Sequence, residues 1–190
     1  KQEKVVDYIQ VNSGRRFSVL EPNAQDILVQ DIAHSLSNLC RFTGHGERFY
    51  SVGEHSIHCA RLARKLGFST LVQLYALGHD ASESVMNDLA RPVKQNIPQY
   101  KELEDKVMSV MWEAMMLPEP SEEDYKAVKM LDNTLLLHEL HQLMKRNGDD
   151  YPEVEHYNAY VDLSVGYGAG DSKQDFLAIY HSLMLELVLD

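Results

Sequence analysis

This sequence has no long apolar run, only two cysteines and no excess of basic side chains, and each of these features excludes a class of protein. No stretch approaches the roughly 20 consecutive apolar residues that a membrane-spanning helix needs, and the segment Lys1 to Gln10 alternates charged and apolar residues instead of carrying a signal-peptide core. The two cysteines, Cys40 and Cys59, lie in sequence typical of helices, which favours reduced thiols over a secreted disulfide framework. We therefore expect a cytoplasmic protein without a membrane partner.

The balance of charge is acidic. The chain has 29 aspartates and glutamates against 18 lysines and arginines, so its formal net charge is −11 at pH 7. The long-range field of such a chain repels the nucleic-acid backbone, and we expect no nucleic-acid partner. A small anionic substrate needs only a few cations that converge locally. With 44% hydrophobic and 25% charged residues, the composition is that of a globular protein, and residues 1–190 are predicted to form one domain.

Apolar residues recur with helical spacing along most of the chain, whereas the first thirty residues follow no period and are predicted to form a loop or a short strand pair. The first helix is predicted from Asp31, placed to cap its amino end, to about Phe42. Ser51 and Glu54, three residues apart, are typical of a capping box that opens a second helix, which Gly67 closes.

Four more helices follow from the same periodicity. They are predicted after Ser69, between Pro98 and Pro118 with an apolar stripe over residues 103–114, from Ser121 to near Gly148, and from about Ser172. The segments 87–98 and 149–170 are predicted to be loops, because prolines interrupt the first and the second has no clean period. Strand alternation is almost absent, so the sequence predicts an all-α, single-domain bundle of about five to seven helices with an irregular N-terminal segment.

Four titratable residues occupy positions where a helical core is expected. Asp132 shares a face with apolar neighbours in the middle of a predicted helix, His79 and Asp80 follow an apolar run, and His55 begins the capped helix. Burying such groups without partners is costly. Two imidazoles and two carboxylates form a ligand set that suits a first-row divalent metal with open positions left for water. Each residue alone also fits a histidine satisfied within the core or an aspartate paired with an arginine.

A rival ligand set lies within a single helix. His55, His58 and Cys59 are spaced so that they can face one ion together. Cys59 also falls on the apolar side of that helix, where a small thiol packs as a core residue. The residues alone leave both metal sets open.

Four ordered sequence blocks give the chain a family resemblance. They are residues 50–56 (YSVGEHS), 79–83 (HDASE), 88–94 (DLARPVK) and 130–132 (MLD), with residues 31–37 (DIAHSLS) and 40–45 (CRFTGH) extending the match upstream. In these blocks the chain resembles the HD-domain metal phosphohydrolases, and within them the phage-type dATP triphosphohydrolases and the bacterial 5′-deoxynucleotidases. The resemblance implies a helical HD-domain fold and, if the protein is encoded by a phage, a place in the host cytoplasm.

The resemblance also implies roles for nine residues. His55, His79, Asp80 and Asp132 match the metal ligands, and Glu83 matches the catalytic carboxylate that handles the attacking water. The substrate-binding positions are matched by Arg41 and Lys94, which hold phosphate, by Phe42, which meets the base or sugar, and by Asp88, which lines the site. The implied cofactor is a divalent transition metal, namely zinc, cobalt or manganese, with additional magnesium on the phosphates.

The expected activity is hydrolysis of dATP to deoxyadenosine and triphosphate, which depletes a precursor of DNA synthesis. The first alternative is a 5′-nucleotidase that acts on deoxynucleoside monophosphates, and the second is a helical metal-binding protein without catalysis. Phe42, where some relatives have tryptophan, and Gly44 depart from the family pattern and leave the base preference open. The apolar last helix and the resemblance together lead us to expect a homo-oligomer, either a dimer or a hexamer.

Overall fold

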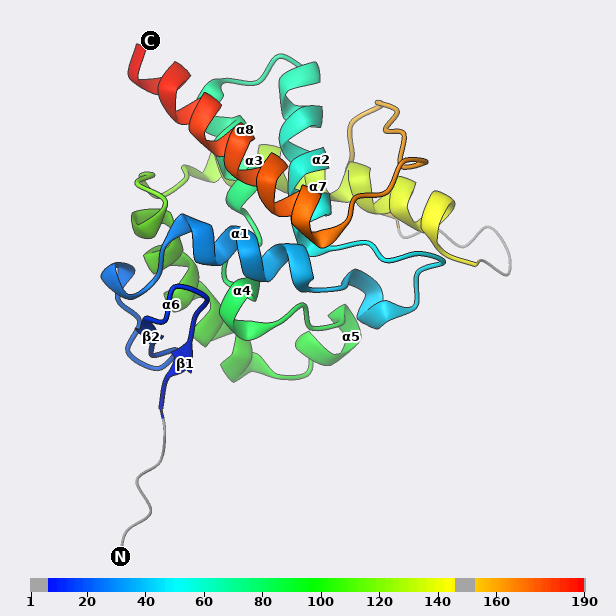
Figure 1. The fold of residues 1–190 in the computed structure, drawn as a ribbon. Helices are drawn as coiled ribbons and strands as arrows, with labels where there is room; N and C mark the ends of the chain where they lie inside the picture. The colour runs from blue at the N-terminus through cyan, green and yellow to red at the C-terminus, as the bar shows by residue number, and fades with distance from the viewer. Residues whose placement is uncertain (1–6, 146–152, 190) are drawn as a thin grey trace, which may run out of the picture.

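A small hairpin precedes a succession of helices in the computed structural model, which describes residues 7–145 and 153–189 (Figure 1). Strands β1 (Ile9–Gln10) and β2 (Arg16–Phe17) pair antiparallel, with Ile9 opposite Phe17, and the 3₁₀ turn η1 (Ala24–Asp26) follows. The predicted irregular N-terminal segment with a short strand pair is confirmed over residues 7–28. Residues 1–6 lie outside the described part of the chain.

Six helices of nine or more residues make up the described structure, together with two short ones. They are α1 (Val29–Asn38), α2 (Val52–Lys65), α3 (Thr70–Gly78), α6 (Pro98–Ala114), α7 (Glu122–Leu143) and α8 (Ala169–Leu189), and the four-residue helices are α4 (Glu83–Met86) and α5 (Arg91–Lys94). One 3₁₀ turn, η2 (Arg41–Gly44), lies between α1 and α2. The prediction of an all-α bundle of five to seven substantial helices is confirmed.

Helix α2 lies at the centre of the bundle and packs against α1, α3, α7 and α8 (Figure 1). Eleven of its fourteen residues are buried, because helices cover it on several sides. The buried apolar side chains of the described residues form one continuous cluster. Charged residues carried by α2 therefore lie in the interior, where they need partners.

Helix α1 differs from its predicted bounds at both ends. It begins at Val29, so Asp31 is its third residue and not its cap; the Asp31 carboxylate accepts hydrogen bonds from Ser13 N (2.6 Å) and Leu28 N (3.0 Å) and so ties the hairpin to the helix. It ends at Asn38 and not near Phe42, because residues 39 and 40 are extended and Cys40 bridges to the segment before α2.

Most of the other predicted helix ends are confirmed. Ser51, Ser69 and Ser121 each accept a hydrogen bond from a backbone N–H in the first turn of α2, α3 and α7. Helix α6 begins at Pro98, where the predicted loop ends, and proline suits the first turn of a helix. Helix α7 ends at Leu143, and the predicted stop near Gly148 lies outside the described residues. Both Cys40 and Cys59 are free thiols, as predicted.

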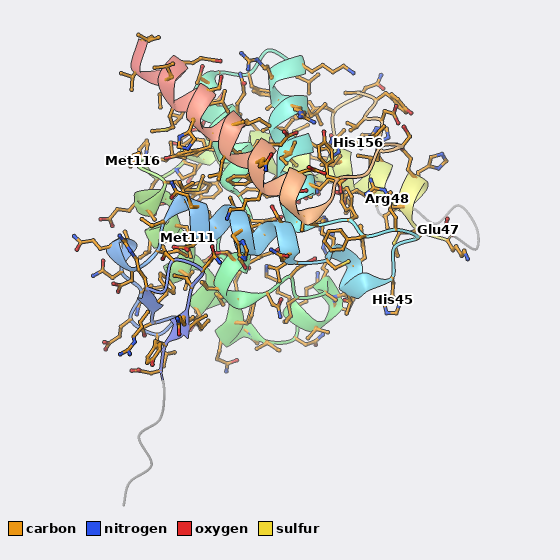
Figure 2. All side chains as sticks on the ribbon, viewed as in Figure 1. His45, Glu47, Arg48, Met111, Met116 and His156 are labelled. Carbon is orange, nitrogen blue, oxygen red and sulfur yellow. The ribbon has the colours of Figure 1, made fainter. Side chains whose placement is uncertain are left out.

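Methionines at the end of α6 mark the boundary of the core. Met111 is fully buried, whereas Met116, two residues past the helix, is 70% exposed at the edge of the molecule (Figure 2). The last turns of α8 also leave Leu185, Val188 and Leu189 exposed. The expectation that a second copy of the chain covers these residues stays a prediction. Within the described residues, no helix combines the length and apolar character that a membrane crossing requires.

Gly53 allows α1 and α2 to approach closely at the point where α2 enters the core. A Cβ atom at this position would lie 2.8 Å from Ser37 Oγ and 3.0 Å from Ser37 N, so the backbone of α1 would have to move. Gly53 is two residues before His55, and the close crossing therefore helps to fix the position of that histidine.

We predict that Gly53→Ala lowers the free energy of unfolding by about 1 to 3 kcal/mol, because overpacking of a rigid contact costs this much. Gly170→Ala, in the first turn of α8 where a Cβ has open space, is the matched control and should be neutral or slightly stabilising. Denaturant unfolding of both variants tests this. Equal effects of the two substitutions would show that the α1–α2 crossing is not tight.

Candidate metal centre and its cavity

The structure brings together the four predicted metal ligands from three separate stretches of chain. His55 Nε2 lies 3.3 Å from His79 Nε2, 3.3 Å from Asp132 Oδ1 and 3.7 Å from Asp80 Oδ2, and His79 Nε2 lies 3.3 Å from Asp80 Oδ2. Ligands bound at about 2.1 Å to one tetrahedral ion are about 3.4 Å apart. These four distances are close to that value, so each of these pairs is spaced as two ligands of one cation would be.

Local structure explains how neighbouring residues can face one point. Helix α3 ends at Gly78, and the chain turns through Ala81 N–H···O Gly78 and Glu83 N–H···O Asp80 hydrogen bonds before α4 begins. His79 and Asp80 lie in this turn, where their side chains converge, whereas adjacent residues of a regular helix point about 100° apart. His55 comes from the first turns of α2 and Asp132 from the middle of α7.

The outer ring nitrogens of both histidines are already engaged. His79 Nδ1 lies 2.8 Å from the Ala76 carbonyl oxygen, which can only accept a hydrogen bond, so the Nε2 atom of a neutral His79 carries the lone pair. His55 Nδ1 lies 2.5 Å from the Glu139 carboxylate. In both rings the nitrogen left for a ligand is Nε2, which faces the other three side chains. A hydrogen-bond acceptor behind a ligating imidazole is the usual arrangement around protein-bound metals.

Glu139 is the residue of this site that sequence reasoning missed. It is fully buried and accepts hydrogen bonds from Tyr50 Oη (2.8 Å) and Arg41 Nη2 (3.1 Å) besides its contact with His55. Glu139 follows Asp132 by two helical turns on α7, on the same face. The signal that singled out Asp132, an acidic residue among apolar ones, was therefore also present at Glu139.

The carboxylates of the centre favour a positive charge between the Nε2 atoms of His55 and His79. Burial on its own raises the pKa of Glu139, but Arg41 and His55 lower it to about 2. Burial likewise raises the pKa of Asp132, yet His55, His79 and Lys129 bring it well below its usual range. Burial and Arg41 lower the pKa of His55, while Cys59, Glu139 and Asp132 raise it well above its usual value. Fixed carboxylates thus stabilise a cation here.

Cys59 adds a further candidate ligand. His55, Cys59 and His79 place one ligand atom each within 4.8 Å of one another, so this group can hold a metal ion, and Cys59 Sγ lies 3.6 Å from His55 Nε2. The structure does not bring together the rival set of His55, His58 and Cys59. His58 instead stacks on Tyr50, with Nε2 3.8 Å from Glu54, because it faces another side of α2.

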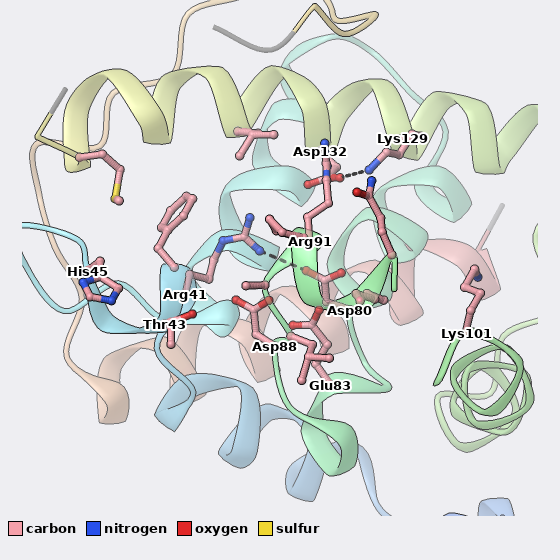
Figure 3. A pocket seen from close by; sticks show the side chains of 18 of the residues that line it. Arg41, Thr43, His45, Asp80, Glu83, Asp88, Arg91, Lys101, Lys129 and Asp132 are labelled. Atoms are coloured by element: carbon pink, nitrogen blue, oxygen red, sulfur yellow. Dashed lines mark hydrogen bonds and ion pairs between the residues drawn. The ribbon is translucent and has the colours of Figure 1, made fainter. Parts of the chain in front are cut away.

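The centre forms part of the wall of a cavity of about 990 Å³ (Figure 3). His55 is fully buried, but the side chains of His79, Asp80 and Asp132 are 13%, 18% and 17% exposed. Asp80 and Asp132 line the cavity, together with η2, residues 88–98, the start of α6 and the inner face of α7. A site open on one side leaves coordination positions for water or substrate, as catalytic metal sites do and closed structural sites do not.

Glu83 and Asp88 lie on the same side of Asp80 in the cavity wall (Figure 3). Glu83 is only 7% exposed, and its Oε2 atom has no hydrogen-bond partner among the described residues. Burial and the neighbouring Asp80 and Asp88 raise the pKa of Glu83 well above its usual value, and burial also raises that of Asp88. A buried carboxylate oxygen without a donor is costly, and such groups concentrate at functional sites.

The predicted phosphate-binding cations lie in the same cavity. Arg41 pairs with Asp80 (3.5 Å) and Glu139 (3.1 Å), while Lys94 forms an ion pair with Glu104. Arg91 also lines the cavity; its carbonyl oxygen accepts a hydrogen bond from Gln95 N, and its guanidinium has no hydrogen bond or ion pair with the described residues. Phe42 lines it too, with the Arg41 guanidinium 5.5 Å from its ring. All nine predicted site residues are thus gathered at one centre and its cavity.

The turn that carries Phe42 is strained. Phe42 and Thr43 have φ values of 55° and 53°, in the left-handed region that bulky and β-branched residues avoid. Hydrogen bonds on both sides hold the turn, from Arg41 N to Tyr50 O and from Val52 N to Leu39 O, both 2.9 Å. Arg41 and Phe42, at the start of this turn, both line the cavity.

Fold and site together define a helical protein with a candidate metal centre in the wall of a cation-lined cavity. The chain is 35% identical over 151 residues to the uncharacterized protein YfdR of Escherichia coli (strain K12), with 79% of this chain and 80% of YfdR covered. It is 39% identical over 111 residues to the uncharacterized protein RCAP_rcc00048 of Rhodobacter capsulatus, with 56% of this chain and 57% of that protein covered. No family profile matches the sequence. The chain belongs to the YfdR family.

We predict that Glu139→Gln weakens divalent-metal binding by about 10- to 100-fold, because the carboxylate orients His55 and increases its basicity. The matched control is Glu54→Gln, which changes an equally buried carboxylate that pairs with Arg48 and touches none of the four ligands. Competition of each protein with a chelating dye for zinc measures the effect. Unchanged metal affinity in Glu139→Gln would mean that Glu139 supports the fold and not the centre.

Proposed function

We propose that this protein is a metal-dependent phosphohydrolase of the HD-domain type that acts on deoxynucleotides. The favoured reaction is hydrolysis of dATP to deoxyadenosine and triphosphate. The observation that carries the proposal is the opening of the centre formed by His55, His79, Asp80 and Asp132 into a cavity that also holds the unpaired oxygen of Glu83 and several cations. The sequence blocks that resemble this enzyme class contribute these same residues.

The proposed cofactor is a divalent transition metal, zinc, cobalt or manganese, held by His55, His79, Asp80 and Asp132. Nitrogen and carboxylate ligands suit all three ions. When bound, such an ion lowers the pKa of its water and polarises a phosphoryl oxygen. The proposed role of further magnesium is to accompany the phosphates of the nucleotide.

The side chains of the cavity divide the remaining work. Arg41 presents a planar fork of donors to phosphate oxygens, while Lys94 and Arg91 add positive charge around the rest of the phosphate chain. Glu83 accepts a proton from the attacking water as the water oxygen bonds to the α-phosphorus and the P–O5′ bond breaks. The departing O5′ atom takes up a proton to give the free hydroxyl of deoxyadenosine. Asp88 lines the site beside Glu83 and shares its buried setting.

A 5′-nucleotidase that releases orthophosphate from a deoxynucleoside monophosphate is the second candidate. It breaks the same P–O5′ bond with the same residues. The observation that favours it is that Lys94 and Lys101 are already paired with Glu104 and Asp105, which leaves fewer uncommitted cations for the β and γ phosphates. The observation that favours the triphosphate is Arg91, whose guanidinium lines the same cavity and has no hydrogen bond or ion pair with the described residues.

We predict that Glu83→Gln lowers turnover of the preferred deoxynucleotide by about 10² to 10⁴-fold while retaining its metal, because a general base contributes this much. Glu102→Gln, an exposed position on α6, is the control and should keep full turnover. The measurement pairs elemental analysis with chromatographic separation of the products formed from each deoxynucleotide in cobalt, manganese or zinc.

The products decide between the candidates. Triphosphate from dATP supports the favoured reaction, and orthophosphate released only from monophosphates supports the nucleotidase. Full metal content without hydrolysis of any deoxynucleotide by the wild-type protein would contradict both and would leave a metal-binding helical protein.

A further inference from the structure

One side of the cavity is formed by residues 88–97, which include α5. This segment supplies Asp88, Arg91 and Lys94, among others, to the cavity wall. Most of its residues are exposed, and the backbone hydrogen bonds of α5 join residues within the segment itself. Contacts with neighbouring elements therefore have to fix the position of the segment beside the cavity.

Two side chains of α6, one helical turn apart on the same face, make such contacts. Tyr100 Oη lies 3.0 Å from the carbonyl oxygen of Met86 and 3.1 Å from that of Asn87, directly before the segment. Glu104 forms an ion pair with Lys94 in α5. Among the described residues, this pair is the only side-chain hydrogen bond or ion pair that joins the segment to another part of the chain.

The pair between Lys94 and Glu104 is partly shielded from water. Their side chains are 30% and 11% exposed, and Lys94 Nζ lies 5.7 Å from the centre of the Tyr100 ring. Burial on its own lowers the pKa of Lys94, but Glu104 raises it above its ordinary value, so the ammonium group stays charged. An ammonium group has three donors, and one bond to Glu104 leaves two for other acceptors. The pair thus fixes the position of Lys94 without using all of its donors.

Lys101, the other lysine of this part of the cavity wall, is held differently. It pairs with Asp105 within α6, and both side chains are 62% exposed. Exposed pairs of this kind contribute little to stability and to the position of either group. The two lysines therefore offer a matched comparison between a shielded pair and an exposed one.

We propose that Glu104 is a positioning residue of the cavity: by holding Lys94 it fixes α5 in the cavity wall, with the ammonium group available to phosphate oxygens. Glu104 does not itself line the cavity, so it acts through Lys94. The identity of the substrate rests on the proposed function. Residue 104 lies outside the sequence blocks that carry the family resemblance, so the resemblance implies no role for it.

We predict that Glu104→Gln weakens binding of inorganic tripolyphosphate to the zinc-loaded protein about three- to tenfold and raises the KM for dATP by a similar factor. The kcat and the zinc content should not change, because a contact with non-reacting phosphates stabilises the bound substrate and the transition state equally. Titration calorimetry with the magnesium salt of tripolyphosphate, initial rates and zinc analysis measure these quantities.

The sign of the effect separates positioning from simple electrostatics. Removal of a negative charge near an anion strengthens anion binding when nothing else changes. Weaker binding in Glu104→Gln therefore reports that Lys94 has lost its position. Glu104→Asp keeps the charge and shortens the side chain, so it should give a smaller loss in the same direction, and it serves as the test if Glu104→Gln does not fold.

Two further variants complete the experiment. Asp105→Asn removes the acidic partner of Lys101 and is the matched control, in which tripolyphosphate binding should be unchanged. Lys94→Met removes the cation, and adding Glu104→Gln to it should not weaken binding further, because the effect of Glu104 passes through Lys94. The double variant also leaves no unpaired charge at this place.

Unchanged or tighter tripolyphosphate binding in Glu104→Gln would overturn the proposal. So would equal weakening by Glu104→Gln in the wild type and in Lys94→Met, or a wild-type protein that does not bind tripolyphosphate. If dATP is hydrolysed and Glu104→Gln leaves its KM unchanged, the positioning role is wrong and the function stands. If no deoxynucleotide is hydrolysed but Glu104→Gln weakens tripolyphosphate binding as predicted, the function is wrong and the positioning role stands.

Discussion

The structure depends on placing several carboxylates close together inside a helical bundle. Asp80, Asp132 and Glu139 converge on His55, which is fully buried, and like charges at this distance repel unless cations stand between them. Arg41 supplies one such cation, because it contacts both Asp80 and Glu139. The carboxylates of Asp80 and Asp132 add further negative charge next to the Nε2 atoms of His55 and His79. A divalent ion at this point would neutralise this negative charge and use the lone pairs of both imidazoles, and this balance of charge links the fold to the proposed chemistry.

Much of the bundle and of the centre follows from local sequence. The serine caps at Ser51, Ser69 and Ser121 set helix starts through hydrogen bonds within the first turn, which need no knowledge of the tertiary structure. Asp132 is recognisable because a charged residue on an apolar helical face needs a partner. The turn after Gly78 lets His79 and Asp80 face one point. The sequence indicates this turn only indirectly, because two adjacent ligands of one ion cannot both lie in a regular helix.

What the sequence did not reveal depends on contacts between distant segments. The end of α1 at Asn38 results from the bridge between Cys40 and Ser51, which competes with helix continuation at a position where local propensity favours a helix. Glu139 acquires its role only when α7 packs against α2 and brings its carboxylate to His55, 84 residues away in sequence. Such pairings are properties of the packed bundle, and single-sequence periodicity does not encode them.

The central claim is that His55, His79, Asp80 and Asp132 hold one divalent ion. The most direct measurement is the metal content of the purified wild-type protein, of Asp132→Asn and of Cys59→Ser after equal exposure to zinc. The account predicts a single ion in the wild type and in Cys59→Ser, and its loss from Asp132→Asn, because the proposed ligand set includes Asp132 and leaves Cys59 as a core residue. Retention of the ion in Asp132→Asn together with its loss from Cys59→Ser would contradict the account and assign the metal to His55, Cys59 and His79.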